Sequence, residues 1–190
     1  AGAADDPHAP TYQTLANLRE LPARARDTPI KESVDRGGKV STGGMDGVAT
    51  VVLVPETRHA VASIFWTFMN SSGPVSDGAG NTATGPLFAN PFYATGYPVT
   101  EAYWTTEKVA GTARQVLMQA FERRVMTDTR GNPAGFAVEA GNVGAHYHPW
   151  GYQAKPPTRV ASRRPRGTPP QPTGSSGQSK PPPAEAPRAP

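Results

Sequence analysis

A short polar run in the second half of the chain carries residue types that could hydrolyse a glycosidic bond. Glu122 is followed by Arg123 and Arg124, and Glu101 supplies a second carboxylate earlier in the same half. Two carboxylates facing one cleft can serve as acid and nucleophile or base, and an arginine can stabilise developing negative charge. On an exposed strand the same residues would instead form cross-strand ion pairs, which is the interpretation we favour.

His146 and His148 could contribute to a metal site. They are two positions apart, so on a strand both imidazoles would point to one side. Zinc would need a third ligand, for which Glu101, Glu122 or Glu139 is available. Their spacing does not identify that third ligand, so we expect no metal and no cofactor. The alternative is a surface aromatic strand that contains both histidines.

Aromatic residues could form a platform for sugar rings, because flat rings with polar tips pack on the apolar faces of glycans. The candidates are Tyr93, Tyr97, Tyr103, Trp104, Tyr147 and Trp150. We expect about half of them to lie in the core, since tyrosine and tryptophan bury well when their polar tips find partners. As contact residues we select Tyr97, Tyr103, Trp104 and Trp150.

The composition changes sharply towards the end of the chain. Residues 155–190 contain 11 of the 22 prolines, seven basic side chains and one acidic side chain. Because the whole chain has a net charge of +4, the remainder is close to neutral at −2. We therefore predict a flexible arm over residues 1–10, one β-rich domain over residues 11–152, and a disordered, basic, proline-rich tail over residues 153–190.

The same composition disfavours several functional classes. The basic charge is concentrated in the predicted tail, whereas a specific nucleic-acid-binding domain should carry it on its folded surface. No cysteine is present, so disulfides and thiolate metal sites are excluded. No apolar run is long enough to predict a membrane span. The start Ala1-Gly2-Ala3-Ala4, without methionine, fits a processed, exported chain or a fragment of a longer protein.

Periodicity predicts the α+β class, with a mostly antiparallel sheet of five or six short strands and two helices packed on it. Thr11 can cap a helix that carries Tyr12, Leu15 and Leu18 at spacings of three. Ile30 and Val34 are expected to share a short helical turn. A second helix is predicted from the apolar stripe of Val61, Ile64, Phe65 and Phe68. Strands are expected at 48–54, 104–109, 113–128 with a bulge or bend near Phe121, and 136–139, with 75–91 as a loop.

Several motifs give the chain a resemblance to known proteins. They are Phe65-Trp66-Thr67-Phe68-Met69-Asn70, Gly96-Tyr97-Pro98-Val99-Thr100-Glu101, Gln119-Ala120-Phe121-Glu122-Arg123-Arg124, Asn132-Pro133-Ala134-Gly135 and Gly141-Asn142-Val143-Gly144. Over about residues 11–152 they resemble an uncharacterised module of exported proteins from Chloroflexota and related bacteria. The Gly-Tyr-Pro turn followed by Phe-Glu-Arg is also similar to the LGFP repeat of cell-wall proteins. That similarity implies a non-catalytic role at the cell surface.

We therefore expect a secreted or cell-surface, non-catalytic module that associates with cell-wall polymer or with a surface protein. Two alternatives remain open. The chain could be a structural subunit that self-associates through unpaired sheet edges, or a glycan-directed hydrolase that uses Glu101 and Glu122.

Overall fold

The computed structural model describes residues 6–133 and 135–141, and the structural statements below concern those residues. The chain divides into two units, residues 1–155 and 156–190. The second unit and the whole predicted tail, residues 153–190, lie outside the described residues.

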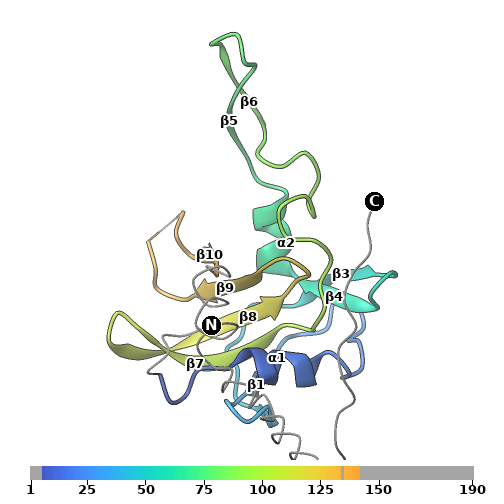
Figure 1. Ribbon diagram of the computed structural model, residues 1–190, viewed down its shortest axis with the longest axis vertical. Helices are drawn as coiled ribbons and strands as arrows, with labels where there is room; N and C mark the ends of the chain where they lie inside the picture. The colour runs from blue at the N-terminus through green and yellow to red at the C-terminus, as the bar shows by residue number, and fades with distance from the viewer. Residues whose placement is uncertain (1–5, 134, 142–190) are drawn as a thin grey trace, which may run out of the picture. The chain divides into compact units, whose positions relative to one another are not determined.

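The described residues form two helices and ten strands (Figure 1). The helices are α1 (Tyr12–Leu18) and α2 (Ser63–Met69). The strands are β1 (Glu32–Val34), β2 (Val40–Thr42), β3 (Thr50–Val54), β4 (His59–Ala62), β5 (Ser72–Ser76), β6 (Thr82–Pro86), β7 (Tyr103–Val109), β8 (Thr112–Ala120), β9 (Val125–Thr129) and β10 (Val138–Ala140). The predicted α+β class with mostly β structure is confirmed.

The main sheet has six strands in the order β10-β9-β8-β7-β1-β2. Its pairings are antiparallel except for β1 with β7, which run parallel and are bridged only at Ser33 and Trp104. The stretch expected as one bent strand over 113–128 is instead the β8–β9 hairpin. Its turn is closed by Phe121, whose N–H donates to the Arg124 carbonyl at 2.8 Å.

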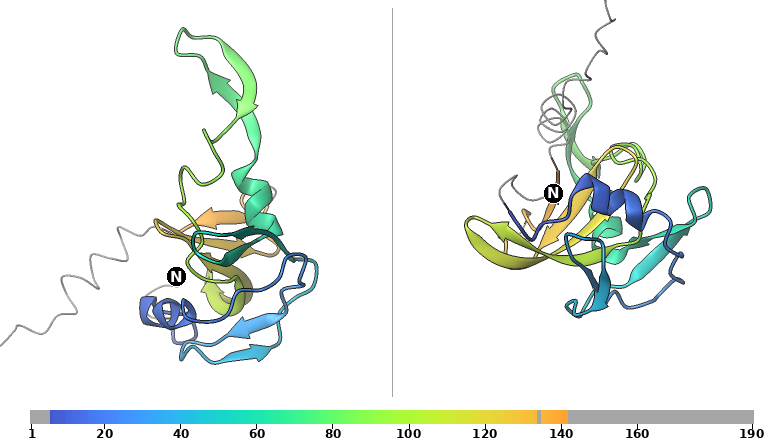
Figure 2. Two further views of the ribbon diagram at one scale, coloured as in Figure 1. Left: turned by 90° about the vertical axis from the view of Figure 1, so that its right-hand side faces the viewer. Right: turned by 60° about the horizontal axis from the view of Figure 1, so that its bottom comes forward.

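Helices α1 and α2 cover opposite faces of the main sheet (Figure 2), and successive residues of β8 pack towards one helix or the other. Leu117 packs in one cluster with Phe65 and Met69 of α2. Its neighbour Met118 packs in a second cluster, with Leu18 of α1. Side chains alternate between the faces of a strand. Adjacent residues of the central strands are therefore buried, one on each side.

Helix α1 agrees with the prediction made from its sequence. The Thr11 side chain accepts a hydrogen bond from the Thr14 backbone N–H, and the Thr14 side chain accepts one from the Thr11 N–H. This reciprocal arrangement satisfies two N–H groups that the first helical turn leaves without partners. Leu15 and Leu18 are buried, as the spacing indicates.

Two other helical predictions are corrected. Ile30 and Val34 do not share a helical turn, because the Ile30 N–H donates to the Val48 carbonyl and Val34 belongs to β1. Val61 lies in β4, so α2 starts only at Ser63. Each helix has seven residues, and within the described ranges no helix is long and apolar enough to cross a membrane.

The two-stranded sheet of β3 and β4 is joined to the main sheet by polar side chains. The Gln119 amide donates to the Ala60 carbonyl at 2.8 Å and accepts from the Ala62 N–H at 3.2 Å. Glu101 accepts from the Ala60 N–H at 2.9 Å. These side chains satisfy the free edge of β4, whose four residues are all buried, where another strand would otherwise be needed.

Residues 75–91, expected as a loop, contain part of an antiparallel hairpin. β5 and β6 pair from Ser72–Pro86 to Ser76–Thr82, and neither strand packs substantially against another helix or strand. Figure 1 shows the hairpin continuing from the end of α2, apart from the strands of the main sheet. The predicted turn cluster is its tip, where the Asp77 N–H donates to the Asn81 carbonyl.

Residues 6–10 are the described part of the segment predicted as a flexible arm, and they contact the rest of the domain. Asp6 is 1% exposed, and its carboxylate accepts hydrogen bonds from the backbone N–H groups of Lys108, His8 and Ala9. The Arg36 guanidinium donates to the carbonyls of Asp6 and Ala9. The bonds from Lys108 and His8 lower the pKa of Asp6 and hold this segment against β7.

The contact between Gly44 and the Trp104 indole gives a stability test. A Cβ atom on Gly44 would overlap the ring, which is fully buried and cannot move aside. We expect Gly44→Ala to lower the free energy of unfolding by about 1–3 kcal/mol, measured by urea denaturation. At the neighbouring Gly43 a Cβ would lie 3.4 Å from the Ser33 hydroxyl, so Gly43→Ala is the matched control. Equal losses in the two variants would contradict the packing described here.

Glu107 gives a test of pH dependence. Burial raises the pKa of its carboxyl, and the negative charge of Asp6 acts in the same direction. The folded state then holds the proton more tightly than the unfolded state. The stabilisation that comes from protonated Glu107 is therefore fully present at low pH. It is lost as pH rises from the ordinary pKa of glutamate through the raised pKa of the folded state.

We expect Glu107→Gln to gain stability relative to the unmodified chain as pH rises from about 4 to about 8. Denaturant titrations across that range measure the difference. Glu139→Gln changes an exposed carboxylate of β10 and serves as the control. A difference for Glu107→Gln that does not vary with pH would show that this carboxyl does not titrate differently on folding.

Candidate functional site

The chain forms a hollow lined by aromatic residues beside the turn that joins β8 and β9. Its volume is about 500 Å³. The lining residues are Asn90, Pro91, Phe92, Tyr93, Gly96, Tyr97, Glu122 and Arg123. We call it the aromatic cavity. Among the predicted site residues, the structure brings Tyr97, Glu122 and Arg123 together here.

The rings of this cavity form a connected row. Phe92 and Tyr97 meet edge to face with ring centroids 5.0 Å apart, and the ring centroids of Phe92 and Trp66 of α2 are 5.7 Å apart. Phe92 and Tyr97 are partly buried against the core, so they are fixed in position. Tyr93 continues the lining and is 66% exposed. The cavity thus combines an anchored aromatic wall with an exposed ring.

The turn Glu122–Arg123 holds the backbone that carries these rings. The Glu122 N–H donates to the Tyr97 carbonyl at 3.0 Å, and the Tyr97 N–H donates back to Glu122 Oε2 at 3.1 Å. The Arg123 N–H donates to the Thr95 carbonyl at 3.0 Å, and its guanidinium donates to the Tyr93 carbonyl at 2.8 Å. Four hydrogen bonds therefore preorganise the segment before any ligand arrives.

Arg124 completes this arrangement, since its Nε donates to the Ala94 carbonyl at 3.3 Å. Among the described residues, Glu122, Arg123 and Arg124 of the predicted polar cluster therefore form no ladder of ion pairs. Their side chains bind backbone groups of residues 93–97. Glu122 lines the aromatic cavity, and its carboxylate can accept a further hydrogen bond from a hydroxyl group.

Glu101 lies elsewhere, in the interior. It is 1% exposed, and its Oε1 accepts from the Ala60 N–H and lies 3.2 Å from His59 Nδ1. The described residues offer no hydrogen-bond partner for its Oε2. Glu101 lines neither the aromatic cavity nor the two other cavities considered below, so it does not share a cleft with Glu122. The predicted carboxylate pair is not assembled.

Two predicted contact residues are corrected, because they belong to the core. Trp104 is fully buried and Tyr103 is 4% exposed. The Trp104 indole N–H donates to the Ile30 carbonyl at 2.9 Å, and an arginine guanidinium lies over each ring, Arg130 over Trp104 and Arg24 over Tyr103. A ring without an exposed face cannot stack on a sugar, so these two rings are not part of an exposed platform.

The remaining predicted residues, Trp150, His146 and His148, lie outside the described residues. Within residues 6–133 and 135–141, no group of three or more potential metal ligands converges. Phe92 and Asn90 were not selected from the sequence, and Tyr93 was only a general aromatic candidate. The dense succession of aromatic and turn residues before Tyr97 is the signal that could have identified them.

A second hollow adjoins the same turn from the α1 side. It measures about 260 Å³ and is largely apolar, with Leu15 and Val99 on its walls and Arg19 and Arg124 among its lining residues. Glu122 and Arg123 line both this groove and the aromatic cavity. The β8–β9 turn therefore lies between this hydrophobic groove and the aromatic cavity.

Comparisons of the chain with protein-family models, with curated proteins and with solved structures find no match in any of the three. Function must therefore be inferred from the geometry of the sites themselves.

Gly96 tests how tightly the turn and the aromatic segment fit together. Its φ of +70° is unfavourable for other residues, and a Cβ would lie 2.5 Å from Glu122 Oε2. At Gly111, with φ of +84°, a Cβ would meet open space. We expect Gly111→Ala to cost about 1–2 kcal/mol of unfolding free energy and Gly96→Ala to cost more, measured by denaturant titration. Equal costs would mean that the Glu122 contact is unimportant.

Proposed function

We propose that this chain is a non-catalytic cell-surface module that binds wall polysaccharide in the aromatic cavity. The observation that carries the proposal is the combination of an exposed ring, Tyr93, with the anchored rings of Phe92 and Tyr97. Such rings stack on the apolar faces of sugars, and the polar groups of Asn90, Glu122 and Arg123 can bind the hydroxyl groups at the rim.

Binding fits this geometry better than hydrolysis does. Hydrolysis by the predicted pair needs two carboxyl groups on either side of one glycosidic bond. Glu122 is the one carboxylate among the residues that line the aromatic cavity, whereas Glu101 bonds to the edge of β4. The arginines beside Glu122 hold the backbone in place. These features support a preformed recognition surface.

The location and the second point of attachment are also part of the proposal. The sequence of residues 153–190 carries a basic excess and many prolines. A chain of this kind would be attracted to anionic wall polymer by charge, in a manner weakened by salt. We propose a secreted or cell-surface protein in which the aromatic cavity supplies the ligand preference and the basic stretch supplies a tether to wall polymer or to a surface protein.

Sedimentation with insoluble cell-wall material tests the proposal. At high salt, where the basic stretch contributes little, we expect Tyr93→Ala to weaken binding about fivefold to tenfold, because one stacking contact is lost. Phe136 is 68% exposed and does not line the cavity, so Phe136→Ala is the matched aromatic control and should bind as the unmodified chain does. Unchanged binding by Tyr93→Ala, or equal loss in the control, would contradict the proposal.

A further inference from the structure

The hydrophobic groove on the α1 side of the β8–β9 turn plays no part in the proposed binding of polysaccharide. Its lining residues are Tyr12, Leu15, Ala16, Arg19, Val99, Ala120, Phe121, Glu122, Arg123, Arg124 and Val125. Glu122 and Arg123 are the two lining residues that it shares with the aromatic cavity, and Tyr93 is not among them. A ligand of the groove can therefore be tested apart from a ligand of the aromatic cavity.

The walls of the groove are apolar and fixed in position. Leu15 of α1 packs in one buried cluster with Ala120 and Val125 of the β8–β9 hairpin, and Val99 packs against that cluster. These side chains offer a preformed apolar surface on one side of the turn. A hydrocarbon ligand that covers this surface removes it from water, which favours binding.

The size of the groove limits what it can hold. A cavity of about 150 Å³ lined by apolar side chains accommodates benzene, which has six carbon atoms. The groove measures about 260 Å³, so on the same scale it has room for roughly ten carbon atoms. An amphipathic helix needs more length, because its anchoring side chains extend over two helical turns. The volume therefore suits a short alkyl chain.

The charged groups that line the groove are mainly positive. Three arginines line it, whereas Glu122 is its one acidic residue within the described ranges. Arg19 is exposed, and its guanidinium forms no ion pair with the other described residues. The Glu122 carboxylate already accepts a hydrogen bond from the Tyr97 N–H. A guanidinium group is thus left for an anionic head group, with which it forms charge-assisted hydrogen bonds.

We propose that the hydrophobic groove binds a fatty acid of about eight to ten carbon atoms in its carboxylate form. The alkyl chain covers the apolar walls formed by Leu15, Val99 and Val125, and the carboxylate binds Arg19. A fatty acid complements both features of the site, because it joins one hydrocarbon chain to one negative charge.

A peptide strand fits the groove less well, because the neighbouring backbone is already paired. The Val99 N–H donates to the Ala120 carbonyl, and the Phe121 N–H donates to the Arg124 carbonyl. The Val125 carbonyl accepts a hydrogen bond from the Gly141 N–H. Strand addition depends on a run of open backbone positions, whereas an alkyl carboxylate needs none.

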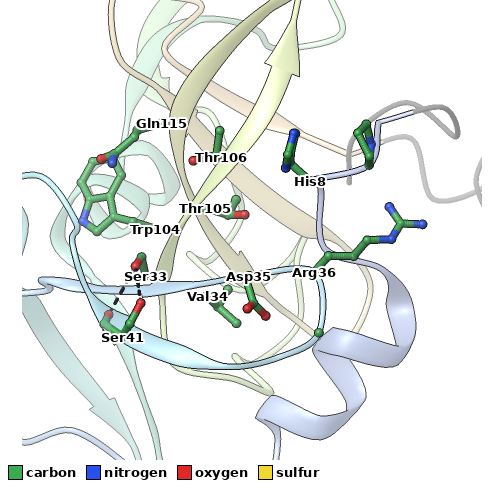
Figure 3. A pocket seen from close by; sticks show the side chains of 12 residues that line it. His8, Ser33, Val34, Asp35, Arg36, Ser41, Trp104, Thr105, Thr106 and Gln115 are labelled. Carbon is green, nitrogen blue, oxygen red and sulfur yellow. Dashed lines mark hydrogen bonds between the residues drawn. The ribbon is translucent and has the colours of Figure 1, made fainter.

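A third hollow, of about 360 Å³, lies between β1 and β7 and is a weaker candidate (Figure 3). Several of its polar groups are already engaged. The Ser33 and Ser41 hydroxyls lie 3.2 Å apart, the Gln115 amide donates to the Gly43 carbonyl, and the Arg36 guanidinium donates to two backbone carbonyls. Its lining therefore selects no particular ligand.

The test is a titration of the full chain with octanoate at neutral pH, below the concentration at which octanoate forms micelles. Nitrogen-15 NMR spectra report the backbone amides, and we expect saturable shifts of those of Leu15, Val99 and Val125. Octanol has the same chain with an uncharged head group and should bind about threefold to fivefold more weakly. Octylammonium, whose charge is positive, should bind more weakly still.

Chain length gives a second measurement on the unmodified chain. Each methylene group that is buried should tighten binding up to about fourfold, so octanoate should bind about tenfold more tightly than hexanoate. The gain should end near ten carbon atoms, since further methylene groups would remain in water.

Arg19→Gln removes the charge that binds the carboxylate. We expect it to weaken octanoate binding about threefold to fivefold and to leave octanol binding unchanged. Arg26 is exposed and does not line the groove, so Arg26→Gln is the matched control and should bind both ligands as the unmodified chain does. Tyr93→Ala should also retain octanoate binding, which separates this site from the aromatic cavity.

Several outcomes would overturn the proposal. These are equal binding of octanoate and octanol, equal effects of Arg19→Gln and Arg26→Gln, or no shift of the Leu15, Val99 and Val125 amides. Tighter binding of a blocked dipeptide of leucine and aspartate than of octanoate would assign the groove to a protein partner instead. Loss of wall binding in Tyr93→Ala with retained octanoate binding would support two distinct sites.

Discussion

The buried indole of Trp104 is the contact on which the arrangement of the main sheet depends. Its N–H bonds to the Ile30 carbonyl, its backbone forms the single bridge between β1 and β7, and Gly44 lies against its ring. Trp104 is thus one of the main attachments of the β1–β2 hairpin to the sheet, together with the hydrogen bond from the Gln115 side chain to the Gly43 carbonyl. Because β1 pairs with β7 at a single residue, the two strands separate beyond that bridge. A cavity of about 360 Å³ lies beside it.

Polar side chains do a large part of the work that strand pairing usually does. Gln119 and Glu101 satisfy the edge of β4, Asp6 satisfies the outer edge of β7 at Lys108, and the β8–β9 turn binds the carbonyls of residues 93–97. A buried backbone group needs a partner, and side chains can supply it at isolated positions. The charged residues that looked available for chemistry are for this reason mostly engaged in holding the chain together.

Features set by neighbours in sequence were predictable, and features set by distant packing were not. The Thr11 cap and the stripe of α1 follow from local spacing, and the β-branched run at 48–54 indicates a strand, observed as β3 at Thr50–Val54. By contrast, Tyr103 and Trp104 are both buried because elements remote in sequence cover both faces of β7. The β5–β6 hairpin escaped prediction because serine, glycine and proline dominate β5 and have weak strand preference.

The aromatic cavity is predictable in part, since the sequence selects Tyr97, Glu122 and Arg123. The role of Glu101 is not, because it depends on the edge of β4, which is remote in sequence.

The prolines of the β5–β6 hairpin determine how it can meet other molecules. The bonds at Ser71–Leu87 and Asp77–Asn81 fix the alternation of the ladder, which places Pro74 and Pro86 at positions whose nitrogen points outward. Proline has no hydrogen to donate there, so each outer edge is interrupted. The outer edges of this hairpin therefore do not favour strand pairing between copies of the protein at high concentration. A partner would bind the hairpin through its faces and not through its edges.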